Sequence, residues 1–341
     1  MVNLFNQSMN KKDILKRVGN ISQIMGASKV ICNDGLGKGT ELIIVKNGKG
    51  LNLTLVPDRG LDILYATYKE IPLAWIARNK VVSNHDYNDK GIGWLRNFGG
   101  GLLTTCGLIS CGGPSTDQGK EFGLHGRISN ISAENVCIKE YWQGDDYYIT
   151  VSGRLRESNT FFENIVLDRE ITVSSANNQI KICDKITNEG FKKEPSMIIY
   201  HMNYGYPLVS KNSELKIDPD NTVVRGDDQS EKNNWNKFSD PIHGFEEVVY
   251  YHDLKPGKNN KCKFELINKD VGISVEATWD KSALDTLIEW KMMGESDYVL
   301  GLEPANCTAN GRASERQAGR MKFLESFEEK IIELTLDVKE I

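Results

Sequence analysis

Residues 164–187 read NIVLDREITVSSANNQIKICDKIT, and this stretch decides the fold class. Two runs rich in apolar and β-branched residues, 164–173 and 179–187, flank the Ala-Asn-Asn segment at 176–178. Alternating runs on either side of turn residues are typical of an antiparallel β-hairpin. The stretch therefore predicts two long paired strands.

The same pattern recurs along the chain. Residues 41–55 form a candidate hairpin around Asn47 and Gly48, and residues 136–155 form another across 143–146. Because strands follow one another with almost no helical windows between them, the sequence predicts an all-β, mostly antiparallel sandwich or barrel. Further alternating runs lie at 213–217, 261–267, 272–277, 298–302 and 330–338.

Two segments differ from this strand pattern. Residues 11–25 carry apolar side chains at helical spacing, which predicts a short amphipathic N-terminal helix. Residues 282–293 are ambiguous, because Ser282 and Asp285 resemble a capping box while the apolar residues that follow fit a buried strand. We favour the strand.

The chain contains no fixed repeat, low-complexity tract or linker that would divide it. We therefore expect a single domain over residues 1–341, with residues 1–30 as a helical N-terminal extension. Residues 77–120 and 221–260 are rich in Gly, Asn and Asp and are expected to be long loops. Long loops on a rigid scaffold commonly carry binding groups.

Composition excludes several classes of protein. With 39% hydrophobic residues in 341, the chain is able to bury a full core. A net charge of -5 supplies no basic stripe for a phosphate backbone, so a nucleic-acid partner is not expected. The first residues lack a basic and apolar leader pattern, and no window approaches ~18 consecutive apolar residues. The sequence predicts a cytoplasmic protein without a membrane anchor.

The cysteines lack the spacing of a metal or disulfide framework. They are odd in number and include no C-x-x-C pair. Reduced, mostly buried thiols are therefore expected, rather than disulfides or a structural zinc site. The seven cysteines stand at positions 32, 106, 111, 137, 183, 262 and 307.

Two of the five histidines have a distinctive setting. His125 stands between glycines, where a ligand or another strand is able to approach the backbone closely. His201 follows the apolar run 197–200, at the place where a buried strand is expected to emerge into a loop. Either residue alone is equally well explained as a core histidine. The other histidines, His85, His243 and His252, lie in polar segments and are predicted to be solvated.

Glu303 has a setting similar to that of His201. It follows the apolar run 298–302 and precedes Pro304, which is expected to end the strand. A carboxylate at the rim of a core tends to have a raised pKa, which suits a general base near neutral pH. A structural carboxylate explains the position as well, and its candidate partners are Arg312, Arg316 and Arg320.

These residues carry a resemblance to a known family. The stretch 164–190, followed by the His201 segment, is similar to the middle of aldose 1-epimerases, where a strand ending in Thr-Asn-x-Gly leads to a catalytic histidine. The LHG sequence at 124–126 resembles the family's earlier Leu-His-Gly motif. The EP sequence at 303–304 resembles its late Glu-Pro motif.

Longer segments resemble a poorly characterised branch of the galactose mutarotase-like superfamily. They are VPDRGLDI at 56–63, FGGGLLTTCG at 98–107 and GLHGRIS at 123–129. The resemblance covers roughly residues 30–338. It implies a galactose mutarotase-like β-supersandwich with its site on the concave face.

The resemblance also implies a chemistry, the interconversion of sugar anomers by acid–base ring opening and closure. Glu303 would take the proton from the anomeric hydroxyl, and His201 would donate one to the ring oxygen. His125 would be a second donor at the ring oxygen or a neighbouring hydroxyl. No cofactor is implied, and the partner is a small-molecule carbohydrate.

The substrate-binding residues are less well defined. The family's arginine precedes the first histidine, which makes Arg96 or Arg59 its counterpart, while its aspartate has only Asp227 or Asp228 as candidates. Arginines in the pocket, Arg154 among them, would favour an acidic or phosphorylated sugar. The expected substrate-binding residues are Arg59, Arg96, Arg127, Asn203, Asp228 and Trp290.

Two other functions remain open at this point. A non-catalytic carbohydrate-binding protein would stack sugars on tryptophans, with Trp75, Trp94, Trp142 and Trp290 as candidates. A metal-dependent sugar isomerase would use His125, His201 and Glu303 as a 2-His-1-carboxylate set. All the catalytic hypotheses require these three side chains to converge within about one sugar ring of each other in a concave pocket.

Overall fold

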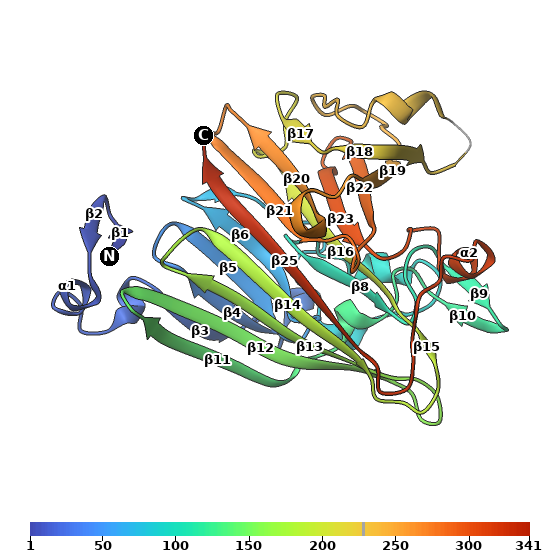
Figure 1. Cartoon of the computed structure of the whole chain (residues 1–341), viewed down its shortest axis with the longest axis horizontal. Helices are drawn as coiled ribbons and strands as arrows, with labels where there is room; N and C mark the ends of the chain where they lie inside the picture. The colour runs from blue at the N-terminus through green and yellow to red at the C-terminus, as the bar shows by residue number, and fades with distance from the viewer. Residues whose placement is uncertain (227–228) are drawn as a thin grey trace.

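The computed structural model describes residues 1–226 and 229–341, and the strands of this part form three larger sheets (Figure 1). Every strand pair in these sheets is antiparallel, which confirms the predicted all-β, mostly antiparallel class. In the described part of the chain, no helix is long and apolar enough to cross a membrane.

An eight-stranded sheet contains the hairpin at 164–187, where Ile171 pairs with Ile182. The predicted strands at 136–155, 261–267, 272–277 and 330–338 belong to the same sheet. Its strand order is β11 (Glu134–Gln143), β12 (Asp146–Ser158), β13 (Asn164–Ser174), β14 (Gln179–Asn188), β25 (Glu329–Glu340), β21 (Ile273–Asp280), β20 (Lys261–Asn268) and β17 (Glu214–Lys216).

A six-stranded sheet holds His201 and Glu303. The ambiguous segment 282–293 is a strand here from Thr286 onward, as favoured, because it pairs on both edges. The strand order is β18 (Pro219–Val224), β19 (Val248–Leu254), β22 (Thr286–Met293), β23 (Tyr298–Ala305), β16 (Met197–Gly205) and β8 (Thr104–Leu108).

A five-stranded sheet contains the hairpin predicted around Asn47 and Gly48, which joins its second and third strands. The order is β3 (Gly26–Ile31), β4 (Glu41–Lys46), β5 (Leu51–Val56), β6 (Asp62–Tyr68) and β7 (Ile71–Pro72). Short strand pairs complete the β structure: β1 (Val2–Leu4) with β2 (Gln7–Met9), β9 (Ser115–Asp117) with β10 (Lys120–Phe122), and β15 (Glu194–Pro195) with β24 (Phe323–Leu324).

Helices are short. The α-helices of the described residues are α1 (Lys11–Leu15) and α2 (Arg312–Gln317). The 3-10 turns are η1 (Ile21–Gln23), η2 (Gly35–Gly37), η3 (Asn84–Asp86), η4 (Gly93–Arg96), η5 (Ile128–Asn130), η6 (Gln229–Asn233) and η7 (Lys258–Asn260).

The main hydrophobic core takes side chains from all three large sheets. Strand β16 is buried along its whole length, and its side chains alternate between two environments. Ile198, Tyr200 and Met202 enter the main core, whereas Met197 and Ile199 belong to a smaller cluster on the opposite face. Because successive side chains of a strand point to opposite faces, His201 also lies on that opposite face.

A buried charge network ties the sheets together beneath this strand. Arg169 on β13 donates from Nε and Nη2 to both carboxylate oxygens of Asp184, at 2.9 and 2.7 Å, and from Nη1 to Asp62 at 2.7 Å. Tyr200 donates its hydroxyl proton to Asp184 at 2.7 Å, and Thr105 donates to Asp62 through both its amide and its hydroxyl. The network thus connects β6, β8, β13, β14 and β16 through hydrogen bonds.

The prediction of an N-terminal helix over residues 11–25 was too long. Helix α1 begins after Asn10, whose side chain accepts from the Asp13 amide, and ends at Leu15. Asn20 then starts a separate 3-10 turn by accepting from the Ser22 amide. Gly19 and Asn20 favour a break in the helix because glycine has low helix propensity and asparagine competes for backbone donors.

The prediction of long loops was wrong for part of residues 77–120 and 221–260. Strand β8 lies in the first of these segments and β19 in the second, and both belong to the six-stranded sheet. Strand β8 has the sequence TTCGL, which is short and lacks a clear alternation. Its strand conformation comes from pairing with β16 and not from its own pattern.

Candidate active site

A cavity of about 720 Å³ opens on the face of the six-stranded sheet that carries His201. This volume lies within the range of small-molecule sites, which is ~300–1,000 Å³. Loops before β8 and after β18 complete its walls. Its lining includes Trp75, Arg78, Asn79, Trp94, Phe98, Leu124, His125, His201, Arg225, Glu247, Val249, Ile288, Trp290, Met292, Asp297 and Glu303.

His201 and Glu303 face each other from adjacent strands. The register that pairs Ile199 with Ala305 and Met202 with Leu302 sets them directly opposite one another. His201 Nε2 lies 3.2 Å from Glu303 Oε1, and both side chains are nearly inaccessible, at 6% and 2%. Glu303 Oε1 is nevertheless buried without a hydrogen bond to any described residue. The site therefore contains an imidazole and a carboxyl group in contact, and one carboxyl oxygen is still able to accept a hydrogen bond.

Both residues lie inside their strands, which corrects the prediction that they stand at strand ends. Strand β16 continues to Gly205, and β23 continues to Ala305. Pro304 does not end β23, since it pairs with Leu287 of β22 on one side. Proline lacks one backbone donor, so it loses pairing with only one neighbouring strand. On the side of β16, no residue pairs with Pro304.

Gly301 provides space for the carboxylate. It lies two residues before Glu303 on the same face of β23, opposite Trp290. A Cβ atom built on Gly301 would lie 2.7 Å from Glu303 Oε1 and 3.1 Å from the Trp290 Cβ. The missing side chain thus lets the carboxylate and the indole lie next to each other in the cavity wall.

His125 reaches the same cavity from a loop. Its backbone is held between two other segments, because its amide donates to Gly112 O at 2.8 Å and its carbonyl accepts from the Gly107 amide at 3.0 Å. The following Gly126 is required by packing, since a Cβ there would lie 2.2 Å from Ser110 O. The ring centroid of His125 lies 5.6 Å from that of His201. The structure therefore brings His125, His201 and Glu303 together.

Aromatic rings form the walls around these three residues. Trp290 contacts His201 edge to face at 5.4 Å between ring centroids, and Trp94 contacts His125 at 4.7 Å. Phe98 stacks on Trp94 at 4.5 Å, and Trp75 meets Trp290 at 6.1 Å. These rings form an apolar enclosure in which electrostatic interactions are stronger than in water.

Burial governs the protonation of the site. It raises the pKa of Glu303 well above its ordinary range, although the positive charge of Arg225 opposes this shift. Burial lowers the pKa of His125 to about 4, and Arg225 adds to that shift. Burial also lowers the pKa of His201 well below its ordinary value, with His125 adding to it. The neutral forms of all three groups are therefore favoured in the free protein.

Charged pairs surround the open side of the cavity. Arg225, just after β18, forms an ion pair with Glu247, which also accepts from the indole Nε1 of Trp290 at 2.7 Å. Arg78 forms an ion pair with Asp297. Each arginine of the cavity lining is thus matched by a carboxylate within the part of the chain that the structure describes.

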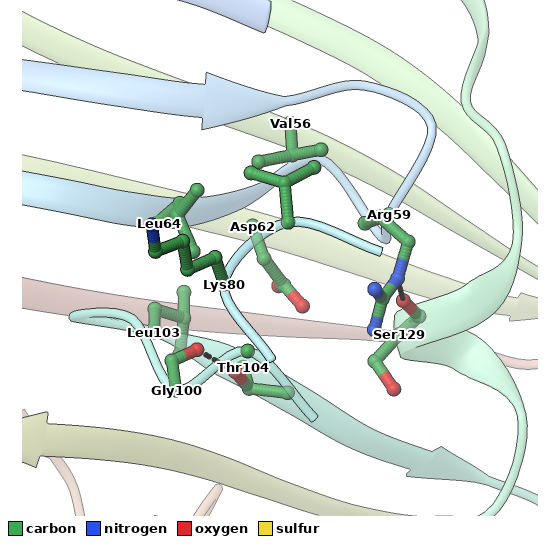
Figure 2. A pocket seen from close by; sticks show the side chains of 11 residues that line it. Val56, Arg59, Asp62, Leu64, Lys80, Gly100, Leu103, Thr104 and Ser129 are labelled. Carbon is green, nitrogen blue, oxygen red and sulfur yellow. Dashed lines mark hydrogen bonds between the residues drawn. The ribbon is translucent and has the colours of Figure 1, made fainter. Parts of the chain in front are cut away.

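Arg59 does not reach this cavity. Its guanidinium donates to three backbone carbonyls, those of Ser129 and Val82 at 2.8 Å and of Asn97 at 2.9 Å. Figure 2 shows it against Ser129 beside a separate, much smaller cavity of about 30 Å³. Burial lowers the pKa of Arg59 to about 10. Its hydrogen bonds join three separate segments of the chain, and the residue does not line the large cavity.

The other expected substrate-binding residues have mixed placements. Trp290 lines the cavity, whereas Arg96 is exposed outside it and Arg127 forms an exposed ion pair with Asp89 at 3.4 Å. Asn203 is fully buried and donates to the carbonyls of Gly101 and His201. Asp228, with Asp227, lies outside the described residues.

One histidine differs from its prediction. His85 and His243 are exposed, as expected. His252, by contrast, is 1% exposed, because it lies on β19 with Nδ1 bonded to Thr222 at 2.9 Å and Nε2 to Glu289 at 3.1 Å. Its polar neighbours in sequence face solvent while the strand alternation turns the imidazole inward.

Sequence reasoning did not identify Arg225 and Glu247 as a pair in the cavity wall. They stand at the two ends of the segment that connects β18 to β19, so pairing of those strands brings them together. Recognising β18 and β19 as a hairpin would have predicted this contact. The hairpin was hidden because the segment between its strands is long and polar.

The geometry also bears on the metal-dependent alternative. Among residues 1–226 and 229–341, the ligand atoms of His125, His201 and Glu303 do not all lie within 4.8 Å of one another. Glu303 Oε1 also lies 3.2 Å from His201 Nε2, so these two groups face each other directly. The arrangement suits proton transfer better than a shared metal ion.

Comparison with known families covers most of the chain. The model of a family described as a domain of unknown function, DUF4432, matches residues 37–338. No curated protein sequence matches the chain.

Solved structures with the same architecture carry sugar-epimerase names. A protein from Klebsiella pneumoniae subsp. pneumoniae MGH 78578, provisionally named aldose 1-epimerase, is 24% identical with a TM-score of 0.88, over 94% of this chain and 86% of that one. A galactose mutarotase-like protein from Clostridium acetobutylicum is 14% identical with a TM-score of 0.65, over 94% and 100%. Galactose 1-epimerase from Lactobacillus acidophilus NCFM is 12% identical with a TM-score of 0.62, over 93% and 99%. These likenesses confirm the galactose mutarotase-like β-sandwich as the fold.

Proposed function

This chain belongs to the DUF4432 family, and from that premise we propose that it interconverts the anomers of a neutral aldose by acid–base ring opening and closure. The observation that carries the proposal is the contact between His201 Nε2 and Glu303 Oε1 at 3.2 Å, inside a cavity whose volume is typical of small-molecule sites. A carboxyl group buried without a hydrogen bond is costly unless a ligand uses it.

The mechanism requires a single proton on the pair. When Glu303 is a carboxylate and His201 an imidazolium, Glu303 takes the proton of the anomeric hydroxyl while the bond from C1 to the ring oxygen breaks. The electron pair of that bond goes to the ring oxygen, which takes a proton from His201. Glu303 is then protonated and His201 neutral, so the pair still holds one proton. Rotation about C1–C2 and the reverse transfers produce the other anomer.

The free protein favours the second of these two protonation states. Burial favours protonated Glu303 and neutral His201, which is the state that closes the ring of an open-chain aldehyde. The two states differ only in the position of one proton across the 3.2 Å contact. Hydroxyl groups of a bound sugar stabilise the ionised form by hydrogen bonding, as does Arg225 near the carboxylate. His125, held at the cavity wall, acts as the accessory hydrogen-bond donor.

The charge of the cavity favours a neutral sugar over an acidic or phosphorylated one. The lining arginines, Arg78 and Arg225, are already paired with Asp297 and Glu247, and Glu303 adds a further carboxyl group. Trp75 and Trp290 instead offer ring faces on which the apolar face of a sugar stacks. An anionic sugar would have to displace an existing ion pair, which a neutral sugar does not.

Polarimetry on a panel of freshly dissolved aldoses tests this proposal. We expect at least one neutral aldose to reach anomeric equilibrium faster with the protein than in buffer. Uronic, sulfonated and phosphorylated sugars of the same configuration are expected to respond less. Acceleration confined to the anionic sugars would reject the neutral substrate class.

The pH dependence of kcat/KM is expected to have its acid limb below pH 6.5, the ordinary imidazole pKa. Because burial lowers the pKa of His201, a second proton binds the pair only at a pH well below that value. Because burial raises the pKa of Glu303, the shared proton is lost only well above the ordinary carboxyl range. Initial rates across a pH series provide the measurement. An acid limb at or above pH 6.5 would mean that His201 titrates as an exposed imidazole does.

Glu247→Gln is expected to shift preference toward anionic sugars. The substitution leaves Arg225 without its carboxylate, so the cavity gains a positive charge near its open side. Partly exposed ion pairs contribute ~0.5–1 kcal/mol, which corresponds to a roughly 2–5-fold change in the ratio of kcat/KM for a uronic acid to that for its neutral parent sugar. The exposed neighbour Glu246→Gln is the matched control and is expected to leave the ratio unchanged. A ratio that moves equally in both variants would rule out a local charge effect.

A further inference from the structure

Three cysteines gather near His125, two from one segment and the third from a distant part of the sequence. Cys106 lies on β8, Cys111 follows that strand, and Cys307 follows β23. All three are buried, and the thiol of Cys111 lies beside those of Cys106 and Cys307. One ligand atom of His125 lies within 4.8 Å of the sulfur atoms of both Cys106 and Cys111.

One ring nitrogen of His125 is buried without a hydrogen-bond partner among the described residues. This nitrogen is Nδ1, which is shielded from solvent. An imidazole nitrogen that is buried without a partner costs free energy, and a metal ion is one of the groups that satisfies it. The thiols beside it are weak hydrogen-bond partners but strong metal ligands once deprotonated.

We propose that Cys106, Cys111 and His125 bind a thiophilic metal ion of the Zn²⁺ type through two sulfurs and Nδ1, with Cys307 as the fourth ligand. Binding replaces the thiol protons, which are released to solvent, so no oxidant or reductant is needed. The donor set of three sulfurs and one imidazole nitrogen is one of the common sets of structural zinc sites.

The spacing of Cys106, Cys111 and His125 requires only small movements to bind an ion. Tetrahedral zinc with Zn–S bonds of about 2.3 Å separates its sulfur ligands by about 3.8 Å. The ligand atoms of Cys106, Cys111 and His125 already lie within 4.8 Å of one another, whereas the Cys307 sulfur lies outside this group and has to move further to become the fourth ligand. Side-chain rotation of Cys106 and Cys111 on a fixed backbone is sufficient for the small movements.

The backbone around the cluster is held in place independently of any ion. The Gly107 amide donates to His125 O at 3.0 Å, the His125 amide to Gly112 O at 2.8 Å and the Gly113 amide to Ala309 O at 2.9 Å. These bonds connect the segments that carry all four ligands. Preorganisation of this kind reduces the entropy that metal binding would otherwise cost.

The proposed ion lies behind the cavity and acts through His125. With Nδ1 on the metal, the other ring nitrogen is fixed as a donor toward the cavity, where His201 lies 5.6 Å away between ring centroids. In this role the cysteines are positioning residues and do not touch a ligand of the cavity. The proposed metal site depends only on the positions of its ligands, and it does not require that a sugar reacts in the cavity.

Cobalt substitution tests the site on the full-length protein. The reduced protein is treated with a chelator, exchanged into metal-free buffer and titrated with Co²⁺ and, separately, with Zn²⁺. We expect one ion per chain and a thiolate-to-Co²⁺ charge-transfer absorption, with Zn²⁺ displacing the Co²⁺ signal. Zn²⁺ is also expected to raise the Tm, because an ion that binds only the native state stabilises it.

The variants separate this site from adventitious binding. Cys106→Ala combined with Cys111→Ala is expected to lose the charge-transfer band and the Zn²⁺-dependent rise in Tm. Cys262→Ala, a buried cysteine on β20 outside the cluster, is expected to keep both. If wild-type protein binds no ion or shows no charge-transfer band, the proposal is wrong, and that readout does not depend on whether the double variant folds. A double variant that binds as wild type does would also overturn it.

Discussion

Glu303→Gln is expected to lower the rate of anomer interconversion by ~10²–10⁴-fold, the range attributed to one general acid–base group. Glutamine keeps the shape of the side chain beside Gly301 and Trp290 but cannot carry the shared proton. The substituted side chain should fold without penalty, since Glu303 is buried and its neutral form is already favoured. Polarimetry with wild-type and variant protein at equal concentration measures the loss.

A matched control comes from the neighbouring strand. Glu289 on β22 is fully buried like Glu303, but its partners are His252 and Lys291, away from the large cavity. Glu289→Gln is therefore expected to keep most of the rate, although it can lower stability. If Glu303→Gln retains wild-type activity, or if both variants lose activity equally, Glu303 is not the base.

Arg169→Met is expected to destabilise the protein by ~3–5 kcal/mol, the range for breaking a buried ion pair from one side. The guanidinium is completely buried and bonds to Asp62 and to both oxygens of Asp184. Its removal leaves two carboxylates between the sheets without their counter-charge. Urea denaturation should show a lower midpoint with an unchanged slope.

Arg154→Met is the matched control for this prediction. Arg154 lies on the adjacent strand β12 and donates from Nε and Nη2 to the two carboxylate oxygens of Asp168, at 2.7 and 2.9 Å. Its side chain is 35% exposed, so the substitution is expected to cost no more than ~1 kcal/mol. Equal destabilisation by the two variants would mean that the buried network contributes no more to stability than the partly exposed ion pair does. Asp184→Asn added to Arg169→Met should recover part of the loss, because it removes one unpaired charge.

The strands were predictable where the sequence alternates beside clear turns. Hairpins β4–β5 and β13–β14 have period-2 burial, and Asn and Gly residues mark their turns. Strand β8 gave no such signal, because its five residues are buried on both faces. For such a strand the neighbours decide the conformation, and the neighbours are not visible in a local pattern.

The candidate site was predictable in its chemical groups but not in its partners. A histidine or a glutamate that follows an apolar run indicates a candidate site, and His201 and Glu303 both have this setting. An arginine gives no comparable signal. Arg59 and Arg225 look alike in sequence. The guanidinium of Arg59 nevertheless donates to three backbone carbonyls, whereas that of Arg225 pairs with Glu247 in the cavity wall.

The cysteine cluster shows a further limit of sequence spacing. Cys106 and Cys111 are separated by four residues, but Cys307 reaches them through the pairing of β8, β16 and β23, and His125 through loop hydrogen bonds to Gly107 and Gly112. Motif spacing detects ligands that share one loop. It does not detect ligands that a sheet gathers from separate strands.

Exchange NMR between the two anomers of a neutral aldose is the most direct test of the central claim, that Glu303 and His201 form an acid–base pair for ring opening. The experiment measures magnetisation transfer between the anomeric protons at equilibrium, so it needs no coupled enzyme. Wild-type protein is predicted to speed the exchange well above the buffer rate, and Glu303→Gln to lower the catalysed exchange by ~10²–10⁴-fold. Exchange at the buffer rate with wild-type protein, for every neutral and anionic sugar in a broad panel, would contradict the account.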